Sequence, residues 1–199
     1  MDKPINKKII RKRKVKIIYL LLSITLQVIT SSANATYIND RFDGEKQQIY
    51  DYSCGISAVA YIFNRYYNIE KSEAELISLT EIKPEYSFLD LTSLAEKFSI
   101  ETSGVKLSTA QLKKIKSPTI LFINRLGKKH FVLYNGMDDG WVQLYDPAWG
   151  YLNYTLAQFE SYWLHDVNRG RALIFSKRIQ TNLDENKILY KKLHAITTQ

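Results

Sequence analysis

The sequence is almost without cysteine, since Cys54 is the single one among 199 residues. One cysteine cannot form a disulfide within the chain, so this thiol is either free or bonded to another molecule. Repeats and low-complexity stretches are also lacking. A composition of 45% hydrophobic and 24% charged residues suits one globular domain with a single core. Cys54 is therefore either a small buried hydrophobe or a reactive thiol, and its surroundings in the sequence must decide between them.

An excess of positive charge is missing from most of the chain, although the net charge is +8. Residues 1–35 contain eight of the 28 Lys and Arg residues and one acidic residue, which leaves 20 basic and 19 acidic residues in the remainder. A nucleic-acid-binding domain carries its basic residues on the folded part of the chain. The distribution of charge therefore argues against a nucleic-acid partner.

A long apolar run is missing too. The most apolar stretch, residues 17–29, is shorter than the roughly 20 residues that a membrane-spanning helix needs. It follows a basic segment and precedes "TSSANA", in which Ala33 and Ala35 match the small-residue pattern before a signal peptidase cleavage site. We expect residues 1–35 to be a signal peptide that is removed. An uncleaved N-terminal anchor is the alternative.

Three segments are thus expected: a signal peptide over residues 1–35, a folded domain over residues 36–178, and a polar helix or tail over residues 179–199. No stretch after residue 36 is apolar and long enough to cross a bilayer. The expected protein is exported, and is periplasmic or extracellular after cleavage. Its contact with the membrane is through the signal segment, and it is membrane-anchored if that segment stays uncleaved.

Apolar periodicity and capping boxes predict helices in the first part of the domain and mostly strands in the second. The expected capping boxes are Ser72 with Glu75, Ser87 with Asp90, and Ser108 with Gln111. The expected helices are Cys54 to about Asn68 and residues 72–79, 87–98, 108–115 and 155–164. The expected strands are residues 101–107, 118–124, 130–137, 141–147 and 171–178. The expected apolar side of the helix at 87–98 consists of Leu89, Leu91, Leu94, Ala95 and Phe98. Helices followed by an antiparallel sheet predict an α+β fold.

Cys54 is expected at the start of the first of these helices. The preceding segment has no apolar period, whereas "ISAVAYIFNRYY" after Gly55 has apolar residues at spacings of three and four. Free backbone N–H groups and the helix dipole favour an anion at such a position, which for cysteine is the thiolate. The position is thus a physical reason for reactivity, while inert packing of the thiol stays open.

A thiol nucleophile needs a base, and His130 opens a predicted strand while Asp146 ends the next one. If residues 138–140 form a three-residue loop with Gly140 in the left-handed conformation, the pairing places His130 and Asp146 on one face. A two-residue loop, Asp139 and Gly140, would place them on opposite faces. Because three-residue loops have Gly in the last position, we expect that loop and a His130–Asp146 pair. A surface His and a turn-capping Asp are the alternative.

Four positions together suggest a family. Gln48 stands six residues before Cys54, Gly follows the cysteine, His130 opens "HFVLYNG", and "YDPAWG" contains Asp146. With this arrangement the chain resembles the C39 family of cysteine peptidases, the papain-like double-glycine leader peptidases, in a stand-alone exported form. The resemblance covers about residues 45–176. It implies a papain-like fold with N-terminal helices packed on a C-terminal antiparallel sheet.

The resemblance also implies roles for these residues in an endopeptidase that cleaves after small residues such as Gly-Gly. Cys54 would be the nucleophile, His130 its ion-pair partner and proton donor, and Asp146 the group that orients the imidazole. Gln48 would stabilise the oxyanion, with Gln47 as the neighbouring alternative. The expected partner is a peptide or small exported protein. No metal or other cofactor is expected, because one Cys and scattered His residues give no ligand cluster.

Some features of the sequence leave alternatives open. Trp149 and Tyr151, in the loop expected after Asp146, either pack in the core or line the cleft beside the thiol. Family members often have Asp before the Cys-Gly pair and Pro after it, whereas this chain has Ser53 and Ile56. A catalytically silent peptide-binding adaptor with the same fold, and an acyl transferase that forms the same thioester, are the rival functions.

Overall fold

The computed structural model describes Tyr19, residues 41–165 and residues 168–176. The chain divides into two compact units, residues 1–44 and residues 45–199, and the folded domain lies in the second.

The expected signal peptide, residues 1–35, lies outside the described residues apart from Tyr19, and so does the expected tail, residues 179–199. In the part of the chain that the structure describes, no helix is both long enough and apolar enough to span a bilayer.

The helices lie where the sequence predicts them. They are α2 (Cys54–Ile62), the π-helical turn η1 (Phe63–Tyr67), α3 (Glu73–Ser78), α4 (Phe88–Glu96), α5 (Thr109–Leu112) and α6 (Leu156–Trp163). Asn68 ends the first helical segment with a left-handed φ of 55°. The predicted capping boxes are present at Ser72 and Glu75, at Ser87 and Asp90, and at Ser108 and Gln111. Local hydrogen bonding thus sets these helix starts.

One expected core position on α4 is wrong. Leu89 is 74% exposed, while Leu91, Leu94 and Ala95 of the same helix are buried. Residues two apart on a helix point about 200° apart, so Leu89 cannot share the face of Leu91. The buried stripe of α4 therefore begins at Leu91.

The strands of the described residues form one antiparallel sheet in the order β1-β6-β2-β3-β4-β5. They are β1 (Thr102–Leu107), β2 (Thr119–Arg125), β3 (Lys128–Asp138), β4 (Trp141–Asp146), β5 (Gly150–Thr155) and β6 (Gly170–Phe175). The α+β class expected from the sequence is confirmed.

Strand β5 corrects the expectation of a loop after Asp146. It pairs with β4 along its whole length, from Trp141 opposite Thr155 to Asp146 opposite Gly150. β5 is an edge strand, and most of its residues are only half-buried. Such a strand lacks the clear apolar alternation by which strands are recognised in a sequence.

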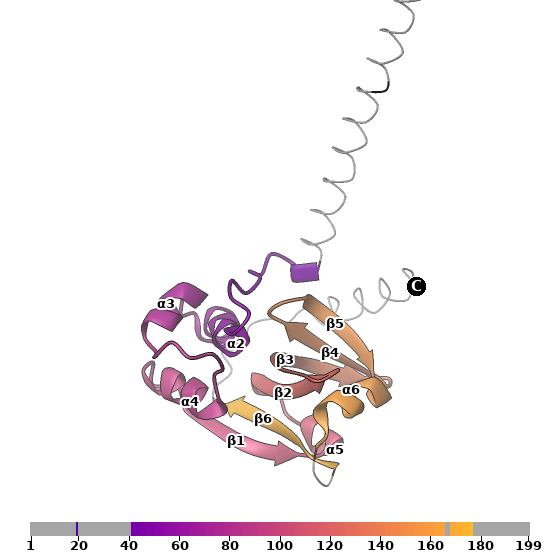
Figure 1. Ribbon diagram of the computed structural model, residues 1–199. Helices are drawn as coiled ribbons and strands as arrows, with labels where there is room; N and C mark the ends of the chain where they lie inside the picture. The colour runs from indigo at the N-terminus through magenta and orange to yellow at the C-terminus, as the bar shows by residue number, and fades with distance from the viewer. Residues whose placement is uncertain (1–18, 20–40, 166–167, 177–199) are drawn as a thin grey trace, which may run out of the picture. The chain divides into compact units, whose positions relative to one another are not determined.

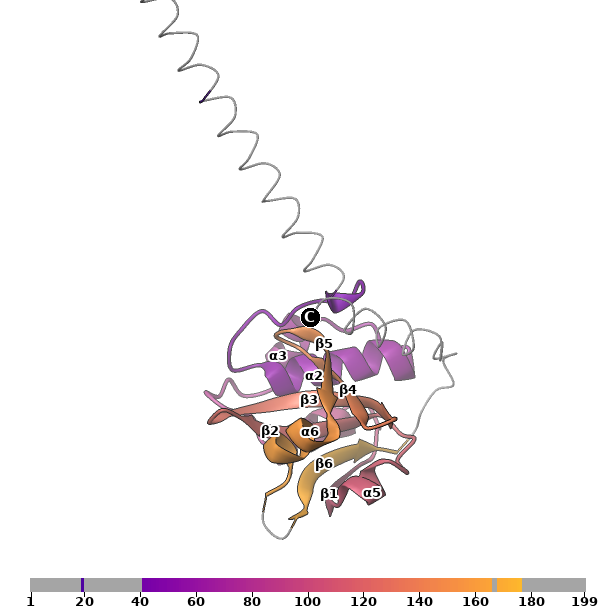
Figure 2. The same ribbon diagram turned by 90° about the vertical axis from the view of Figure 1, so that its right-hand side faces the viewer.

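Helices cover both faces of the sheet. The ring of Phe131 on β3 packs against α2 at Gly55, whereas Val132 belongs to a buried cluster with Phe159 and Trp163 of α6. Because successive residues of a strand point to opposite faces, α2 and α6 lie on opposite faces of the sheet. Figure 1 shows α2, α3 and α4 gathered on one side of the sheet, and Figure 2 shows α2 running along it.

Candidate active site

Cys54 is the first residue of α2, as the sequence predicts, and its side chain is buried and free of any disulfide. The next residue, Gly55, explains how the helix can lie there. A Cβ on Gly55 would lie 3.0 Å from the ring of Phe131 and 3.1 Å from a methyl of Leu91. The missing side chain therefore lets the first turn of α2 approach β3 and α4, and this close approach holds Cys54 against the sheet.

The turn between β3 and β4 is shorter than the sequence analysis predicts. Asp138 pairs with Trp141, so the loop has two residues, Asp139 and Gly140, and the expected three-residue loop is wrong. Their φ angles are 45° and 78°. Positive φ at both central residues is typical of the type I′ turn that Asp-Gly favours, because its twist matches that of the strands. The positive φ expected at Gly140 is confirmed.

A β-bulge in β3 restores the alignment that the longer loop would have produced. The register between β3 and β4 shifts by one residue at Asn135, just before Gly136. Beyond the bulge the pairing is the one that a three-residue loop implies. Since alternate residues share a face, His130 and Asp146 come to lie on the same side of the sheet. The predicted pair therefore forms, but because of the bulge and not because of the loop length that the turn residues suggested.

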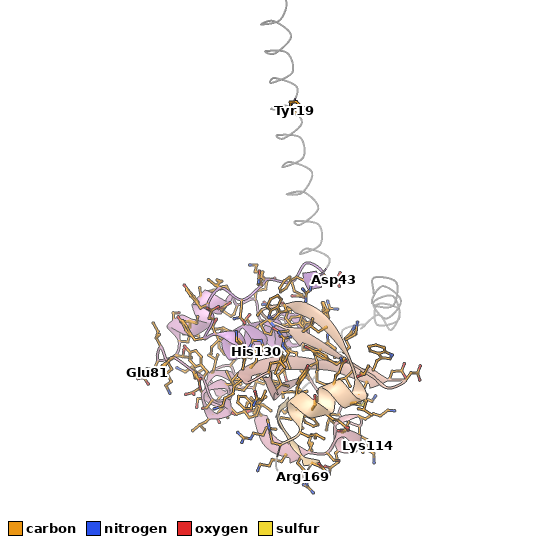
Figure 3. All side chains as sticks on the ribbon, turned by 45° about the vertical axis from the view of Figure 1, so that its right-hand side comes forward. Tyr19, Asp43, Glu81, Lys114, His130 and Arg169 are labelled. Atoms are coloured by element: carbon orange, nitrogen blue, oxygen red, sulfur yellow. The ribbon has the colours of Figure 1, made fainter. Side chains whose placement is uncertain are left out.

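His130 and Asp146 are in direct contact, with Nε2 of the imidazole 2.7 Å from Oδ1 of the carboxyl group. Asp146 is 1% exposed. Its Oδ1 also accepts hydrogen bonds from the backbone N–H of Ala148 at 2.8 Å and of Trp149 at 3.3 Å. The turn that begins "DP" thus fixes the carboxyl group independently of the histidine. Figure 3 shows His130 where the helices of the domain meet the sheet.

The pKa of the His130 imidazole depends on burial, on Asp146 and on Cys54. Burial lowers its pKa, but the hydrogen bonds to Asp146 and to Cys54 raise it more, to about 9. Nε2 is engaged by Asp146, which leaves Nδ1 as the ring nitrogen for Cys54. A histidine with this pKa is an imidazolium at neutral pH, and an imidazolium beside a thiol favours the thiolate.

Gln48 and Gln47 lie in the loop that precedes α2, and this loop is tied to the turn after Asp146. The N–H of Gln48 donates to the carbonyl of Pro147 at 2.8 Å, and Nε2 of Gln47 donates to the carbonyl of Ala148 at 2.9 Å. Nε2 of Gln48 donates to the carbonyl of Tyr50 at 2.9 Å, while its Oε1 is buried without a hydrogen-bond partner among the described residues. Both candidate glutamines are thus held near the His130–Asp146 pair.

A pocket of about 240 Å³ opens beside the thiol and the imidazole. Its lining includes Pro84 and four aromatic residues, Tyr52, Tyr86, Phe122 and Phe131. Phe122 and Phe131 are directly paired across β2 and β3, with ring centroids 5.2 Å apart. None of these four residues was expected in the pocket from the sequence. Pairing of the two predicted strands would have indicated that Phe122 and Phe131 lie side by side. Tyr86 lies in a loop, where no periodic pattern indicates which way a side chain points.

Trp149 and Tyr151, the two aromatic residues considered for the cleft, are not among the residues that line this pocket. Trp149 is 51% exposed, and the guanidinium of Arg125 lies 5.9 Å from its ring centroid. The hydroxyl of Tyr151, on β5, is 2.9 Å from the hydroxyl of Tyr61 on α2. The structure therefore gathers Cys54, His130 and Asp146, but sets these two aromatic side chains elsewhere.

A buried thiol at a helix start beside a histidine–carboxyl pair, on an α+β fold, is the arrangement of papain-like cysteine peptidases. The chain belongs to the peptidase C39 family, whose family model matches residues 45–177. Membership of a peptidase family favours hydrolysis of peptide bonds over the adaptor interpretation.

Curated relatives with a protease name support the same assignment. The chain is 31% identical over 131 residues to the probable functional amyloid protease FapD of Pseudomonas aeruginosa, a match that covers 62% of this chain and 58% of the relative. The FapD protein of Pseudomonas fluorescens is 26% identical over the same coverage. The chain thus spans 58% of the length of each of these relatives.

Two solved structures share the fold. One is a double glycine motif protease from an AMS/PCAT transporter in complex with the leader peptide, with 22% identity, a TM-score of 0.58, and coverage of 66% of this chain and 89% of that one. The other is the peptidase domain of Streptococcus ComA, with 21% identity, a TM-score of 0.58, and coverage of 67% and 97%.

Proposed function

We propose that the chain is an exported endopeptidase in which Cys54, His130 and Asp146 form the catalytic triad and Gln48 completes the oxyanion hole. The observation that carries the proposal is the 2.7 Å contact between His130 Nε2 and the buried Asp146, which leaves the other ring nitrogen for Cys54. A thiol, an imidazole and an orienting carboxylate in this order are the arrangement that nucleophilic catalysis requires.

In the acylation step the Cys54 thiolate attacks the carbonyl carbon of the scissile peptide bond. A C–S bond forms, and the carbonyl oxygen becomes an oxyanion. When this intermediate collapses, the C–N bond breaks, and the imidazolium of His130 donates its Nδ1 proton to the leaving amine. The products of this step are the free amine and a thioester on Cys54, and His130 is left neutral.

In the deacylation step neutral His130 removes a proton from water, and the resulting hydroxide attacks the thioester. The C–S bond breaks, so that the carboxylic acid product leaves and the thiolate–imidazolium pair is restored. Throughout both steps the proton on Nε2 stays on His130, and Asp146 accepts its hydrogen bond and so holds the ring in one orientation. The orientation of Asp146 itself comes from the N–H groups of Ala148 and Trp149.

Two donors are available for the oxyanion. The N–H of Cys54 is in the first turn of α2, where backbone N–H groups have no partner inside the helix. The side-chain amide of Gln48 carries two hydrogens, and the Tyr50 carbonyl takes one of them. The second hydrogen is available to a tetrahedral intermediate. Removal of such a donor typically lowers the rate by about 10²–10³.

The proposed substrate is a peptide or small exported protein with small residues, such as Gly-Gly, before the scissile bond. A double glycine motif protease with a leader peptide bound shares this fold. The curated relatives are named functional amyloid proteases, so a subunit or secretion component of a functional amyloid is the substrate that we would test first. Cleavage would then occur outside the cytoplasm, because the proposed signal segment, residues 1–35, directs export.

The proposal is tested by incubating the purified protein with exported amyloid-forming proteins of the same cell and with peptides that contain Gly-Gly. New N-termini are identified by mass spectrometry. Cys54→Ala and His130→Ala are expected to abolish cleavage. His165, which follows α6 and is not part of the proposed triad, provides the matched variant His165→Ala, which is expected to retain it. Cleavage that persists in Cys54→Ala would overturn the proposed mechanism. Cleavage sites without a small residue before the bond would overturn the proposed specificity.

A further inference from the structure

The carboxyl group of Glu73 points away from its own helix and into the loop before Cys54. Glu73 is the first residue of α3, and its Oε2 accepts a hydrogen bond from the N–H of Ile49 at 2.9 Å. Its Oε1 accepts from the hydroxyl of Ser53. Glu73 is 7% exposed and Ser53 is fully buried. A buried carboxyl group is costly unless it is hydrogen-bonded, and these bonds hold both ends of the segment 49–53.

The contacts of Glu73 continue to the proposed oxyanion donor. The hydroxyl and the N–H of Ser53 lie 2.7 Å and 3.2 Å from the carbonyl oxygen of Tyr50. The same carbonyl oxygen accepts the hydrogen bond from Nε2 of Gln48 at 2.9 Å. A continuous set of hydrogen bonds therefore links Glu73 through Ser53 and the Tyr50 carbonyl to the amide of Gln48.

The start of α3 does not need Glu73. Ser72 caps the helix by accepting the N–H of Glu75, and Glu75 in turn accepts the N–H and the hydroxyl of Ser72. Lys71 makes an ion pair with Glu75 at 3.1 Å. The structural requirements of this helix end are thus met by Ser72 and Glu75. The role of the buried carboxyl group of Glu73 lies in the loop that it contacts.

We propose that Glu73 is a positioning residue for the oxyanion hole, which fixes the segment 49–53 and thereby orients the side-chain amide of Gln48, the proposed oxyanion donor. This inference rests on the proposed function. Glu73 acts on the step in which a carbonyl oxygen gains charge, because that step uses the Gln48 amide. It has no such effect on the thiolate–imidazolium pair, which His130 and Asp146 maintain from β3 and β4.

Two small probes separate these steps without knowledge of the natural substrate. Iodoacetamide alkylates the thiolate by displacement of iodide, and no oxyanion forms. N-acetylglycine p-nitrophenyl ester is attacked at its carbonyl carbon, so that an oxyanion forms before the C–O bond breaks and p-nitrophenolate leaves. The rates of alkylation and of the p-nitrophenolate burst are measured for the wild type, Glu73→Ala, Glu73→Gln and the matched control Glu75→Ala.

Glu73→Ala is expected to lower the rate of acylation by at least about tenfold and to leave alkylation within about threefold. Glu73→Gln is expected to retain acylation within about threefold, because a glutamine can accept the N–H of Ile49 and donate to Ser53. Glu75→Ala disrupts the capping box on the same helix, so it lowers the melting temperature but changes neither rate by more than about threefold.

A double variant gives the sharpest result. If Glu73 acts through Gln48, Glu73→Ala lowers acylation little further in a Gln48→Ala background, whereas independent roles would multiply the two losses. The inference would be overturned if the two losses of acylation rate multiplied in the double variant. It would also be overturned if Glu73→Ala lowered acylation and alkylation equally, or if Glu75→Ala lowered acylation as much as Glu73→Ala does. If Glu73→Ala does not fold, Ser53→Ala interrupts the same link and carries the same expectation. Reaction of Cys54→Ala with both probes would instead contradict the proposed function.

Discussion

His130 and Asp146 meet because β3 contains one residue more than its pairing with β4 requires. The two-residue turn at Asp139 and Gly140 alone would place them on opposite faces of the sheet, and the register shift at Asn135 reverses that outcome. The 2.7 Å contact between the imidazole and the carboxyl group is thus a consequence of the bulge. Bulges that aim a side chain are common beside active sites.

Gly136, which follows the bulge residue, is expected to be needed for this alignment. Its φ is 143°, a conformation that other residues rarely adopt. Gly136→Ala is therefore expected to lower the free energy of unfolding by about 1–3 kcal/mol and to reduce peptidase activity. Gly104→Ala on β1 is the control, since a Cβ there meets nothing within 4 Å. Urea denaturation and a cleavage assay measure both effects, and equal stability of the two variants would contradict the prediction.

Gly55 is expected to be needed for packing. The added methyl of Gly55→Ala would lie 3.0 Å from the ring of Phe131 and 3.1 Å from Leu91, so that these side chains must move. We expect a loss of about 1–3 kcal/mol in the free energy of unfolding. A displaced first turn of α2 would also move Cys54 away from His130, so activity falls with it. The additional variant Leu91→Ala removes one of the opposing side chains, and it should reduce the difference in activity between Gly and Ala at position 55.

The reactivity of Cys54 answers whether the thiol is catalytic or only packed. With the imidazolium of His130 beside it, Cys54 should react with iodoacetamide at mildly acidic pH at least about tenfold faster than His130→Ala does. Gln48→Ala should leave this rate nearly unchanged while depressing peptide cleavage, because alkylation forms no oxyanion. The alkylation rate of Asp146→Ala should lie between those of His130→Ala and Gln48→Ala, since the imidazole ring is misoriented but present. Rates that are alike in the wild type and His130→Ala would instead indicate a buried, inert cysteine.

The raised pKa of His130 predicts how stability and activity depend on pH. Burial lowers this pKa, but the hydrogen bonds to Asp146 and Cys54 raise it above the ordinary 6.5 to about 9. Because folding favours the protonated form, the stabilisation is fully present below about pH 6.5 and is lost as the pH rises through about 9.

Two measurements check this dependence. The difference in the free energy of unfolding between wild type and His130→Ala should shrink from about pH 6 to about pH 10, as followed by urea denaturation. The alkaline limb of kcat/KM should lie near pH 9 in the wild type and at lower pH in Asp146→Asn, which removes the negative charge beside the ring. An alkaline limb that is identical in both proteins would rule out this role for Asp146.

Export is predicted from residues 1–35. The apolar run is short, and "ANA" ends at Ala35, so the mature chain is expected to begin at Thr36. N-terminal sequencing of the secreted protein tests the cleavage site, and Ala35→Arg should block processing, because signal peptidase requires a small residue there. Recovery of an intact N-terminus from wild-type cells, in the membrane fraction, would favour an anchored enzyme.

The sequence by itself determined the features that depend on neighbouring residues. The capping residues Ser72, Ser87 and Ser108 mark helix starts that the structure confirms, and Cys54 begins its helix as predicted. The positive φ at Gly140 was predictable for the same reason, since a hydrogen bond or a backbone angle within one turn involves only a few adjacent side chains.

The tertiary structure alone decided what depends on residues far apart in the chain. Neither the bulge at Asn135 nor the edge strand after Asp146 has a local signal, because each is defined by its pairing with another strand. The buried contacts of Glu73 with Ile49 and Ser53 join segments 20 or more residues apart. Residue types and spacing therefore indicate which groups are available for catalysis, whereas sheet register and packing decide which of them meet.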